Sequence, residues 1–173
     1  MLGTRFREGL LCFVLSLALA FGSLADDQSL PDDLTTAILV KLLQFNERAC
    51  RTKSIRIHVV DQSELAKSIR KFLGTRIGEG QLVEVTIGGD LPVNGTDVIV
   101  FGVKRDISEY IEYAQEHSAL SVSNVLRGVE SGASLVIYDD EGFPGVILNH
   151  ESSTREGQRL KPGILEIAEL FEE

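Results

Sequence analysis

Short apolar strands alternate with amphipathic helices along most of this chain, and that alternation limits the fold more than any other feature. Residues 55–60 alternate apolar and polar side chains as a strand does, and an apolar helical stripe follows at 65–73. A second alternating strand is expected at 82–87, and the wholly apolar run at 98–101 is typical of a central strand covered on both faces. Strands that alternate with helices indicate a mostly parallel sheet with helices packed against it.

The C-terminal third predicts a hairpin that makes the sheet mixed. Strands are expected at 134–138 and 146–148, and the turn-forming segment 139–142 lies between them. Asn149 is expected to cap a short helix, and Pro162 to begin a last helix with an apolar stripe. The predicted fold is therefore a single-domain α/β sandwich, with a mixed, mostly parallel sheet flanked by helices and a C-terminal β-hairpin.

The first 25 residues have the pattern of a secretory signal peptide. Arg5 and Arg7 form a basic head, residues 10–21 are almost wholly apolar, and Ser23–Ala25 provides a small-residue cleavage site. The apolar run of about a dozen residues is shorter than the roughly 20 that a membrane span needs. We therefore expect cleavage after Ala25, a mature domain of residues 26–173 in the periplasm, and no direct membrane insertion after cleavage.

The charge balance argues against nucleic-acid binding. The chain has 17 basic and 26 acidic residues and a formal net charge of −9. Affinity for nucleic acid comes mainly from clustered Lys and Arg, which an acidic chain of this kind lacks. After removal of the leader, Cys50 is the only cysteine left, so a disulfide within the chain is excluded. A lone exported thiol either pairs between chains or stays free and reactive, and these alternatives stay open.

The first predicted helix, Asp32–Glu47, carries more apolar surface than one buried stripe needs. Leu39, Val40 and Leu43 add apolar side chains beside the main stripe. A helix that is apolar on most sides is buried on most sides. It lies either between core layers or against another chain, so these three residues are the candidate contact for a homodimer or a partner.

The motifs of the common enzyme classes are absent from the sequence. There is no G-x-S-x-G, no H-E-x-x-H, and no glycine-rich loop that ends in Lys-Ser/Thr. Residues 74–80 contain glycines but follow a predicted helix rather than a strand, so they match neither a P-loop nor a dinucleotide fingerprint. We therefore expect no catalytic centre, no metal and no cofactor.

One crevice remains as a candidate ligand or partner site. Ligands of open α/β sheets collect outside the carboxyl ends of the strands. The residues expected there are Asp61, Lys104, Arg105, Ser123 and Asn124. The two basic residues with the serine hydroxyl have the chemistry to hold a small anion at a helix start. Helix capping and ordinary surface charge are the alternative interpretation of the same residues.

The mature chain resembles the YfiR-like family of exported proteins. Asp97–Phe101 is similar to the family's central strand, and Ala119–Ser123 to its next strand. Gly145–Asn149, followed by Pro162–Ala168, resembles its C-terminal ending. The resemblance implies an α/β sandwich around a mixed sheet, in agreement with the fold predicted above.

The resemblance also implies a function. Members of the family are periplasmic repressors that bind the periplasmic domain of a membrane-bound diguanylate cyclase and lower cyclic-di-GMP output and biofilm formation. By that resemblance, this chain is expected to be a regulator rather than an enzyme. A periplasmic module that binds or senses a small ligand is the alternative.

Overall fold

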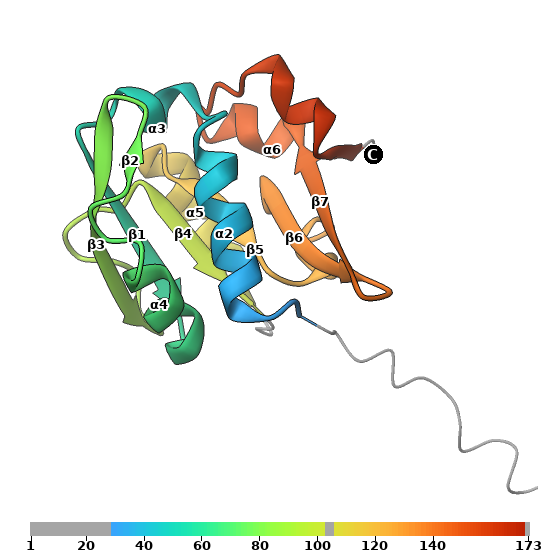
Figure 1. Cartoon of the computed structure of the whole chain (residues 1–173), viewed down its shortest axis with the longest axis horizontal. Helices are drawn as coiled ribbons and strands as arrows, with labels where there is room; N and C mark the ends of the chain where they lie inside the picture. Colours follow the sequence, from blue (N-terminus) through green and yellow to red (C-terminus); the bar gives the residue numbers. More distant parts are fainter. Residues whose placement is uncertain (1–28, 103–105, 172–173) are drawn as a thin grey trace, which may run out of the picture.

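One mixed sheet organises the part of the chain that the computed structural model describes, residues 29–102 and 106–171. Its strand order is β2-β3-β1-β4-β5-β6-β7-β8 (Figure 1). The strands are β1 (Ser54–Val60), β2 (Arg76–Ile77), β3 (Gly80–Gly88), β4 (Val98–Phe101), β5 (Leu120–Ser123), β6 (Leu135–Asp140), β7 (Phe143–Asn149) and β8 (Glu169–Phe171). Neighbouring strands are parallel except for the β2–β3 and β6–β7 pairs, which confirms the mixed, mostly parallel sheet and its C-terminal hairpin.

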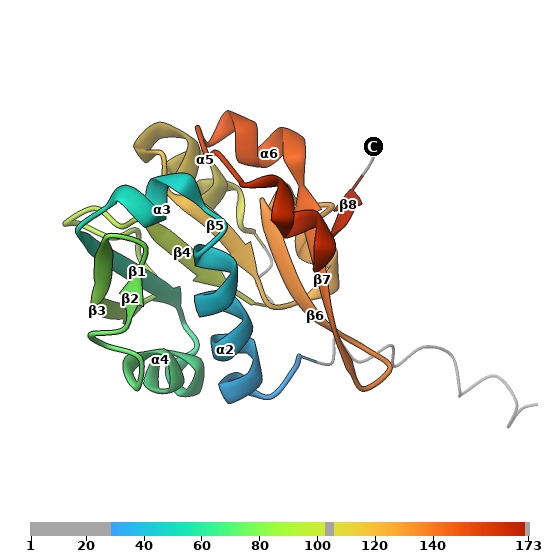
Figure 2. The same cartoon turned by 45° about the horizontal axis from the view of Figure 1, so that its top comes forward.

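Helices cover both faces of this sheet. The helical segments are α2 (Asp32–Leu43), α3 (Glu47–Arg51), α4 (Ser63–Arg70), α5 (Ser108–His117), α6 (His150–Arg155) and the short 3-10 turns η1 (Leu126–Gly128) and η2 (Pro162–Glu166). α2 and α4 lie side by side on one face, and α5 lies on the other (Figures 1 and 2). No helix within the described residues is long and apolar enough to cross a membrane.

The central strand β4 shows how the sequence pattern produces two core layers. Val98 and Val100 belong to the core cluster under α2 and α4, whereas Ile99 and Phe101 belong to the cluster under α5. All four residues are buried. The strand is apolar without interruption because its side chains alternate between two covered faces.

The proposed contact role of the first helix is corrected by the structure. Leu39, Val40 and Leu43 are only 1%, 8% and 0% exposed, so they are core residues and are not available to a second chain. α2 lies across the sheet and contacts α4 and β6, and this enclosure accounts for its apolar surface on several sides. Leu34 in the first turn of the same helix is 39% exposed.

The last predicted helix is also wrong. Only the single turn η2 forms after Pro162, and the chain then extends into β8, which pairs in parallel with β7. After Ser123 the chain forms only the single turn η1, and the Ser123 hydroxyl hydrogen-bonds to the backbone of Val125 in a local turn before it. By contrast, Asn149 caps α6 as predicted, since its side chain accepts a 2.9 Å hydrogen bond from the Ser152 amide.

Candidate functional site

Three of the five residues predicted to form a crevice at the carboxyl ends of the strands, Asp61, Ser123 and Asn124, lie within the described residues. Asp61 and Asn124 follow β1 and β5, whereas Lys104 and Arg105 lie outside the described residues. Ser123 is 0% exposed, and its hydroxyl accepts a 3.2 Å hydrogen bond from the Val125 amide. Its side chain also lies against Gly128, so the prediction that this hydroxyl faces a ligand is wrong.

Two side-chain amides, those of Gln62 and Asn124, meet at this end of the sheet. Nδ2 of Asn124 donates a 2.6 Å hydrogen bond to Oε1 of Gln62. The remaining amide atoms, Oδ1 of Asn124 and Nε2 of Gln62, are buried without a hydrogen-bond partner among the described residues. Asn124 is 4% exposed. The pair therefore offers one acceptor and one donor side by side, which fits a neutral polar group better than a simple anion.

Glycine allows the backbone to approach this pair. A Cβ atom on Gly102, directly after β4, would lie 2.8 Å from Oδ1 of Asn124 and 2.9 Å from Nε2 of Gln62. Sequence analysis missed Gln62 because glutamine in a predicted helix start has no distinctive pattern. Its position next to Asp61, at the end of a buried strand, was the only available signal.

Asp61 terminates β1 in a left-handed conformation, with φ of 53°. A Cβ atom on Gly89 would lie 2.9 Å from both carboxylate oxygens of Asp61. The N-cap residue of α4 is Gln62, and its side chain makes no capping hydrogen bond. A non-glycine residue in this region is uncommon, which marks the end of β1 as a locally strained position.

A second cavity, of about 290 Å³, lies over β1 and β3 under the loop that follows β3. Its lining includes Arg56 and His58 of β1 and Glu84 and Thr86 of β3. Nδ1 of His58 is 2.8 Å from the Thr86 hydroxyl, and Nε2 is buried without a partner among the described residues. Burial lowers the pKa of His58, although the nearby Asp61 carboxylate acts in the opposite direction.

The third cavity, about 310 Å³ in volume, is mainly apolar and lies near the C-terminus. We call it the C-terminal groove; its lining includes Leu148, His150, Leu160, Lys161, Ile164, Leu165 and Leu170. Leu165 and Leu170 are 56% and 48% exposed. No carboxylate is among the described residues that line it. An exposed apolar concavity of this kind is typical of a surface that binds another molecule.

Cys50 is half-buried beside this region and is a free thiol. Its Sγ lies 3.2 Å from the backbone oxygen of Gln44 and 3.4 Å from Nζ of Lys161. The same lysine donates a 2.8 Å hydrogen bond to that Gln44 oxygen. These contacts fix the thiol against the chain's own atoms, and whether Cys50 pairs between chains stays a prediction.

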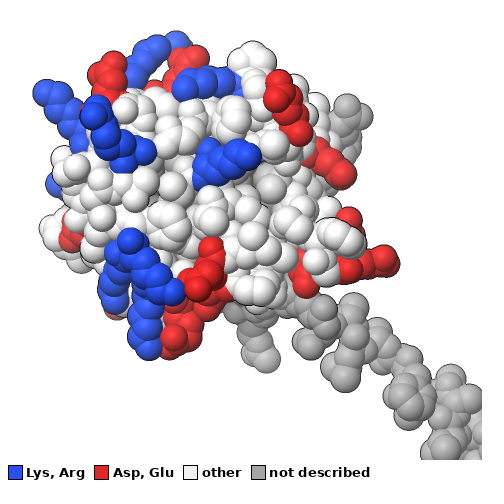
Figure 3. Space-filling view, viewed as in Figure 1, with Lys and Arg blue, Asp and Glu red and all other residues white. Residues whose placement is uncertain are grey.

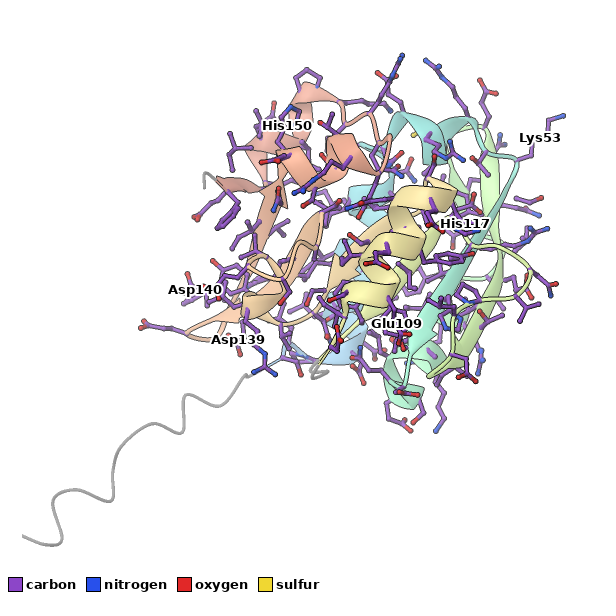
Figure 4. All side chains as sticks on the ribbon, turned by 180° about the vertical axis from the view of Figure 1, so that it is seen from behind. Lys53, Glu109, His117, Asp139, Asp140 and His150 are labelled. Carbon is purple, nitrogen blue, oxygen red and sulfur yellow. The ribbon has the colours of Figure 1, made fainter. Side chains whose placement is uncertain are left out.

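The charged side chains of the described residues do not assemble a metal site. No group of three or more His, Cys, Asp or Glu side chains there has the arrangement to hold an ion. Figure 4 shows that Glu109 and His117 lie on α5, well apart from Asp139 and Asp140 at the hairpin tip. At the lower left of the face in Figure 3, basic and acidic side chains are neighbours, and the ion pair of Asp33 with Lys71 measures 2.7 Å.

This architecture defines a mixed α/β domain built on one eight-stranded sheet. The family model described as YfiR/HmsC-like matches residues 32–169, and the chain belongs to this family. The members of this family are regulators rather than enzymes.

Comparison with known structures agrees with the fold. A conserved domain protein from Vibrio cholerae O1 biovar El Tor has a similar structure, with a TM-score of 0.53 and 16% sequence identity. The match covers 84% of this chain but 61% of the Vibrio chain, so this chain spans less than two thirds of that protein. No sequence among curated proteins matches this chain.

Proposed function

We propose that this chain is a periplasmic regulatory protein that binds the outer domain of a membrane-bound diguanylate cyclase, represses it, and lowers cyclic-di-GMP signalling. Membership of the YfiR/HmsC-like family carries this proposal, because the match extends over nearly the whole described domain. The leader of residues 1–25 is proposed to direct export and to be cleaved after Ala25.

The C-terminal groove is the surface that best suits contact with the cyclase. Leu165 and Leu170 expose apolar side chains beside a concavity whose described lining has no carboxylate. A partner that inserts an apolar side chain there removes this surface from water. Repression follows by a population shift. The chain binds one conformation of the outer domain more tightly than the other, and the difference between these two affinities sets how strongly the bound conformation is favoured.

Direct binding tests the proposal. The purified chain is titrated against the outer domain of a diguanylate cyclase encoded next to it, and cellular cyclic-di-GMP is measured with and without the chain. Leu165→Glu is expected to weaken binding at least tenfold and to raise cyclic-di-GMP, because it places a charge in the apolar contact. Leu34→Glu, at an exposed position of α2, is the matched control. Absence of binding, together with unchanged cyclic-di-GMP on deletion, contradicts the proposal.

The amide pair of Gln62 and Asn124 favours a second candidate function, the sensing of a small, neutral polar ligand. Its buried donor and acceptor are complementary to an amide or a hydroxyl group. A thermal-shift screen of neutral amides and sugars tests this, because a specific ligand raises apparent stability by mass action. Gly102→Ala is expected to abolish the shift, since its Cβ would occupy the space between the two amides. A shift that survives this substitution argues against the site.

A further inference from the structure

A hollow with three arginines in its wall lies where α3 meets the segment that follows α6. Its volume is about 320 Å³, and its lining consists of Glu47, Arg48, Arg51, Thr52 and Arg159. We call it the arginine hollow. The chain as a whole carries a net charge of −9, so this local positive charge runs against the overall balance. The described lining contains no aromatic side chain that could stack on a base or another flat ring.

The two sides of the arginine hollow are held together by the backbone. The Glu47 amide donates a 2.8 Å hydrogen bond to the Arg159 oxygen, and Asn46 forms an antiparallel bridge with Leu160. Nδ2 of Asn46 also donates a 2.9 Å hydrogen bond to Oε1 of Gln158, and both side chains are buried. Figures 1 and 2 show α3 beside the segment that follows α6. The backbone of Arg159 is therefore fixed next to α3 before a ligand arrives, which lowers the entropic cost of binding.

The positive charge of the arginine hollow is only partly neutralised by the chain itself. Nη2 of Arg51 lies 3.4 Å from Oε2 of Glu47, in an exposed pair four residues apart on α3. Arg48 and Arg159 are exposed, and neither has an ion-pair partner among the described residues. The Thr52 hydroxyl donates its hydrogen to the Arg48 backbone oxygen, at 2.9 Å. Two guanidinium groups are therefore left to bind an anion.

The chemistry of these two side chains indicates the class of anion. A guanidinium group presents its N–H donors in a planar fork that matches two oxygens of one phosphate or carboxylate. A phosphomonoester at pH 7 carries a charge of about −1.5 to −2 and three acceptor oxygens, so one such group balances two arginines. A cavity of about 320 Å³ also has room for a small organic body beside the phosphate.

A lipid headgroup is a poorer source of the same phosphate. Anionic membrane surfaces repel a chain with a net charge of −9. We propose that the arginine hollow binds a small, soluble phosphomonoester, with Arg48 and Arg159 donating hydrogen bonds to its phosphate oxygens. This site is separate from the C-terminal groove, which is lined instead by Leu160 and Lys161, the next two residues of the chain. Binding there does not require the proposed repression of a cyclase, and the purified chain is sufficient to test it.

Isothermal titration calorimetry with glycerol 3-phosphate, in a buffer free of phosphate and sulfate, measures this binding. Saturable binding by wild type is expected, and acetate, which carries a single charge, is expected to bind at least about tenfold more weakly. Arg48→Gln and Arg159→Gln are each expected to raise the dissociation constant about tenfold, because each removes charge-assisted hydrogen bonds. Arg155→Gln is the matched control. It removes an exposed arginine of α6 outside the hollow, so it changes the net charge equally and is expected to raise the constant less than about threefold.

No saturable binding by wild type, or equal weakening by all three arginine variants, overturns the proposal. Arg48, Arg155 and Arg159 are exposed, so thermal melting of each variant without ligand is expected to match wild type. Vesicles of phosphatidylcholine and phosphatidic acid test the lipid source of the same phosphate group. Retention of wild type on these vesicles, lost in Arg159→Gln and without binding of glycerol 3-phosphate, overturns the assignment to a soluble ligand.

Glu47→Gln tests the charge of the ligand from the opposite direction. It removes the one carboxylate in the described lining and releases Arg51, so it is expected to lower the dissociation constant for glycerol 3-phosphate about threefold. Glu151→Gln removes a carboxylate that pairs with Arg155 on α6, outside the hollow, and is expected to change the constant less than about twofold. Weaker binding by Glu47→Gln, or an equal gain in both variants, contradicts an anion held by these arginines.

Discussion

The Ser134 hydroxyl donates a 2.6 Å hydrogen bond to Oε2 of Glu156, a residue that is 0% exposed. The amide and the hydroxyl of Ser121 also donate to this carboxylate, the amide at 3.0 Å. Glu156 directly follows α6, whereas Ser121 lies in β5 and Ser134 directly before β6. One buried carboxylate therefore connects the C-terminal segment to the centre of the sheet.

Glu156 makes the stability of the fold depend on pH. Burial raises the pKa of Glu156 from 4.5 to about 6, although the serine donors act in the opposite direction. The folded state therefore binds this proton more tightly than the unfolded state does. The resulting stabilisation is complete below pH 4.5 and is lost as the pH rises through about 6. Between pH 5 and pH 8 the expected loss is about 1 kcal/mol.

Glu156→Gln isolates this contribution. The variant lacks the titrating group, so its free energy of unfolding is expected to fall about 1 kcal/mol less than that of wild type between pH 5 and pH 8. Urea denaturation at both pH values gives the change in the free energy of unfolding for each protein. All other titrating groups are the same in the two proteins. Glu151→Gln, at an exposed position in α6, is the control and is expected to keep the wild-type slope. Parallel slopes for wild type and Glu156→Gln would rule out the shifted pKa.

His58 is expected to change the stability of the fold with pH in the direction opposite to Glu156, over an overlapping pH range. Burial lowers the pKa of His58 from 6.5, so the unfolded state binds this proton more tightly. The stabilisation from a neutral His58 is present above pH 6.5 and is lost as the pH falls through the lower, folded-state value. His58→Gln is therefore expected to lose less stability than wild type on acidification from pH 7 to pH 5, as measured by urea denaturation. His150→Gln, an exposed histidine, serves for comparison, and a wild-type acid response in His58→Gln contradicts the prediction.

Local patterns predicted the sheet well because its central strands are specified by their own side chains. β4 is apolar and buried throughout, and β1 is buried from Ile57 to Val60. The alternation predicted for β3 is interrupted where its register with β1 shifts, and Val83 is 39% exposed there. The sequence did not predict β8, because a strand of three residues is too short to show alternating apolar and polar side chains. Pairing with the edge of β7 sets its conformation. The inward face of α2 was misjudged because which side chains are covered depends on the sheet and on α4.

The candidate sites depended more heavily on contacts between distant residues. Gln62 and Asn124 are 62 positions apart, and no local signal connects two amides over that distance. Glu156 follows a short polar helix, where glutamate normally faces water, so its burial could not be expected from sequence. The C-terminal groove forms only because the predicted last helix is replaced by η2 and β8.

Two glycines at opposite ends of β3 are expected to differ sharply in their tolerance of alanine. A Cβ atom on Gly80 would overlap the backbone oxygen of Thr52, and backbone atoms cannot turn away as a side chain can. At Gly88 the nearest atom is Cε1 of His58 at 3.8 Å, an ordinary contact distance. Gly80→Ala is expected to lower the free energy of unfolding by about 2–3 kcal/mol and Gly88→Ala by less than about 1 kcal/mol. Urea denaturation at pH 7 measures both, and equal losses would contradict the predicted overlap.

Asn46 is expected to contribute more to stability than an ordinary helix cap. Its Oδ1 accepts a 2.9 Å hydrogen bond from the Ala49 amide, and its Nδ2 donates a 2.9 Å hydrogen bond to Oε1 of the buried Gln158. Asn149 caps α6 in the same way, but its side chain makes no second side-chain hydrogen bond within the described residues. Asn46→Ala removes the cap and leaves the Gln158 oxygen without its donor, an expected loss of about 2–3 kcal/mol.

Asn149→Ala is the matched control, because it removes a cap alone and is expected to lose about 1 kcal/mol. Asn46→Asp separates the two roles of the first residue. The aspartate keeps the cap but offers no donor to Gln158, so its stability is expected to lie between that of wild type and Asn46→Ala. Chemical denaturation of the four proteins under one condition gives the order. If Asn46→Ala and Asn149→Ala lose the same free energy, the bond to Gln158 adds nothing. The link between α3 and the C-terminal segment then comes from their other contacts, which include the backbone hydrogen bond of the Glu47 amide to the Arg159 oxygen and the contact of Lys161 with Cys50.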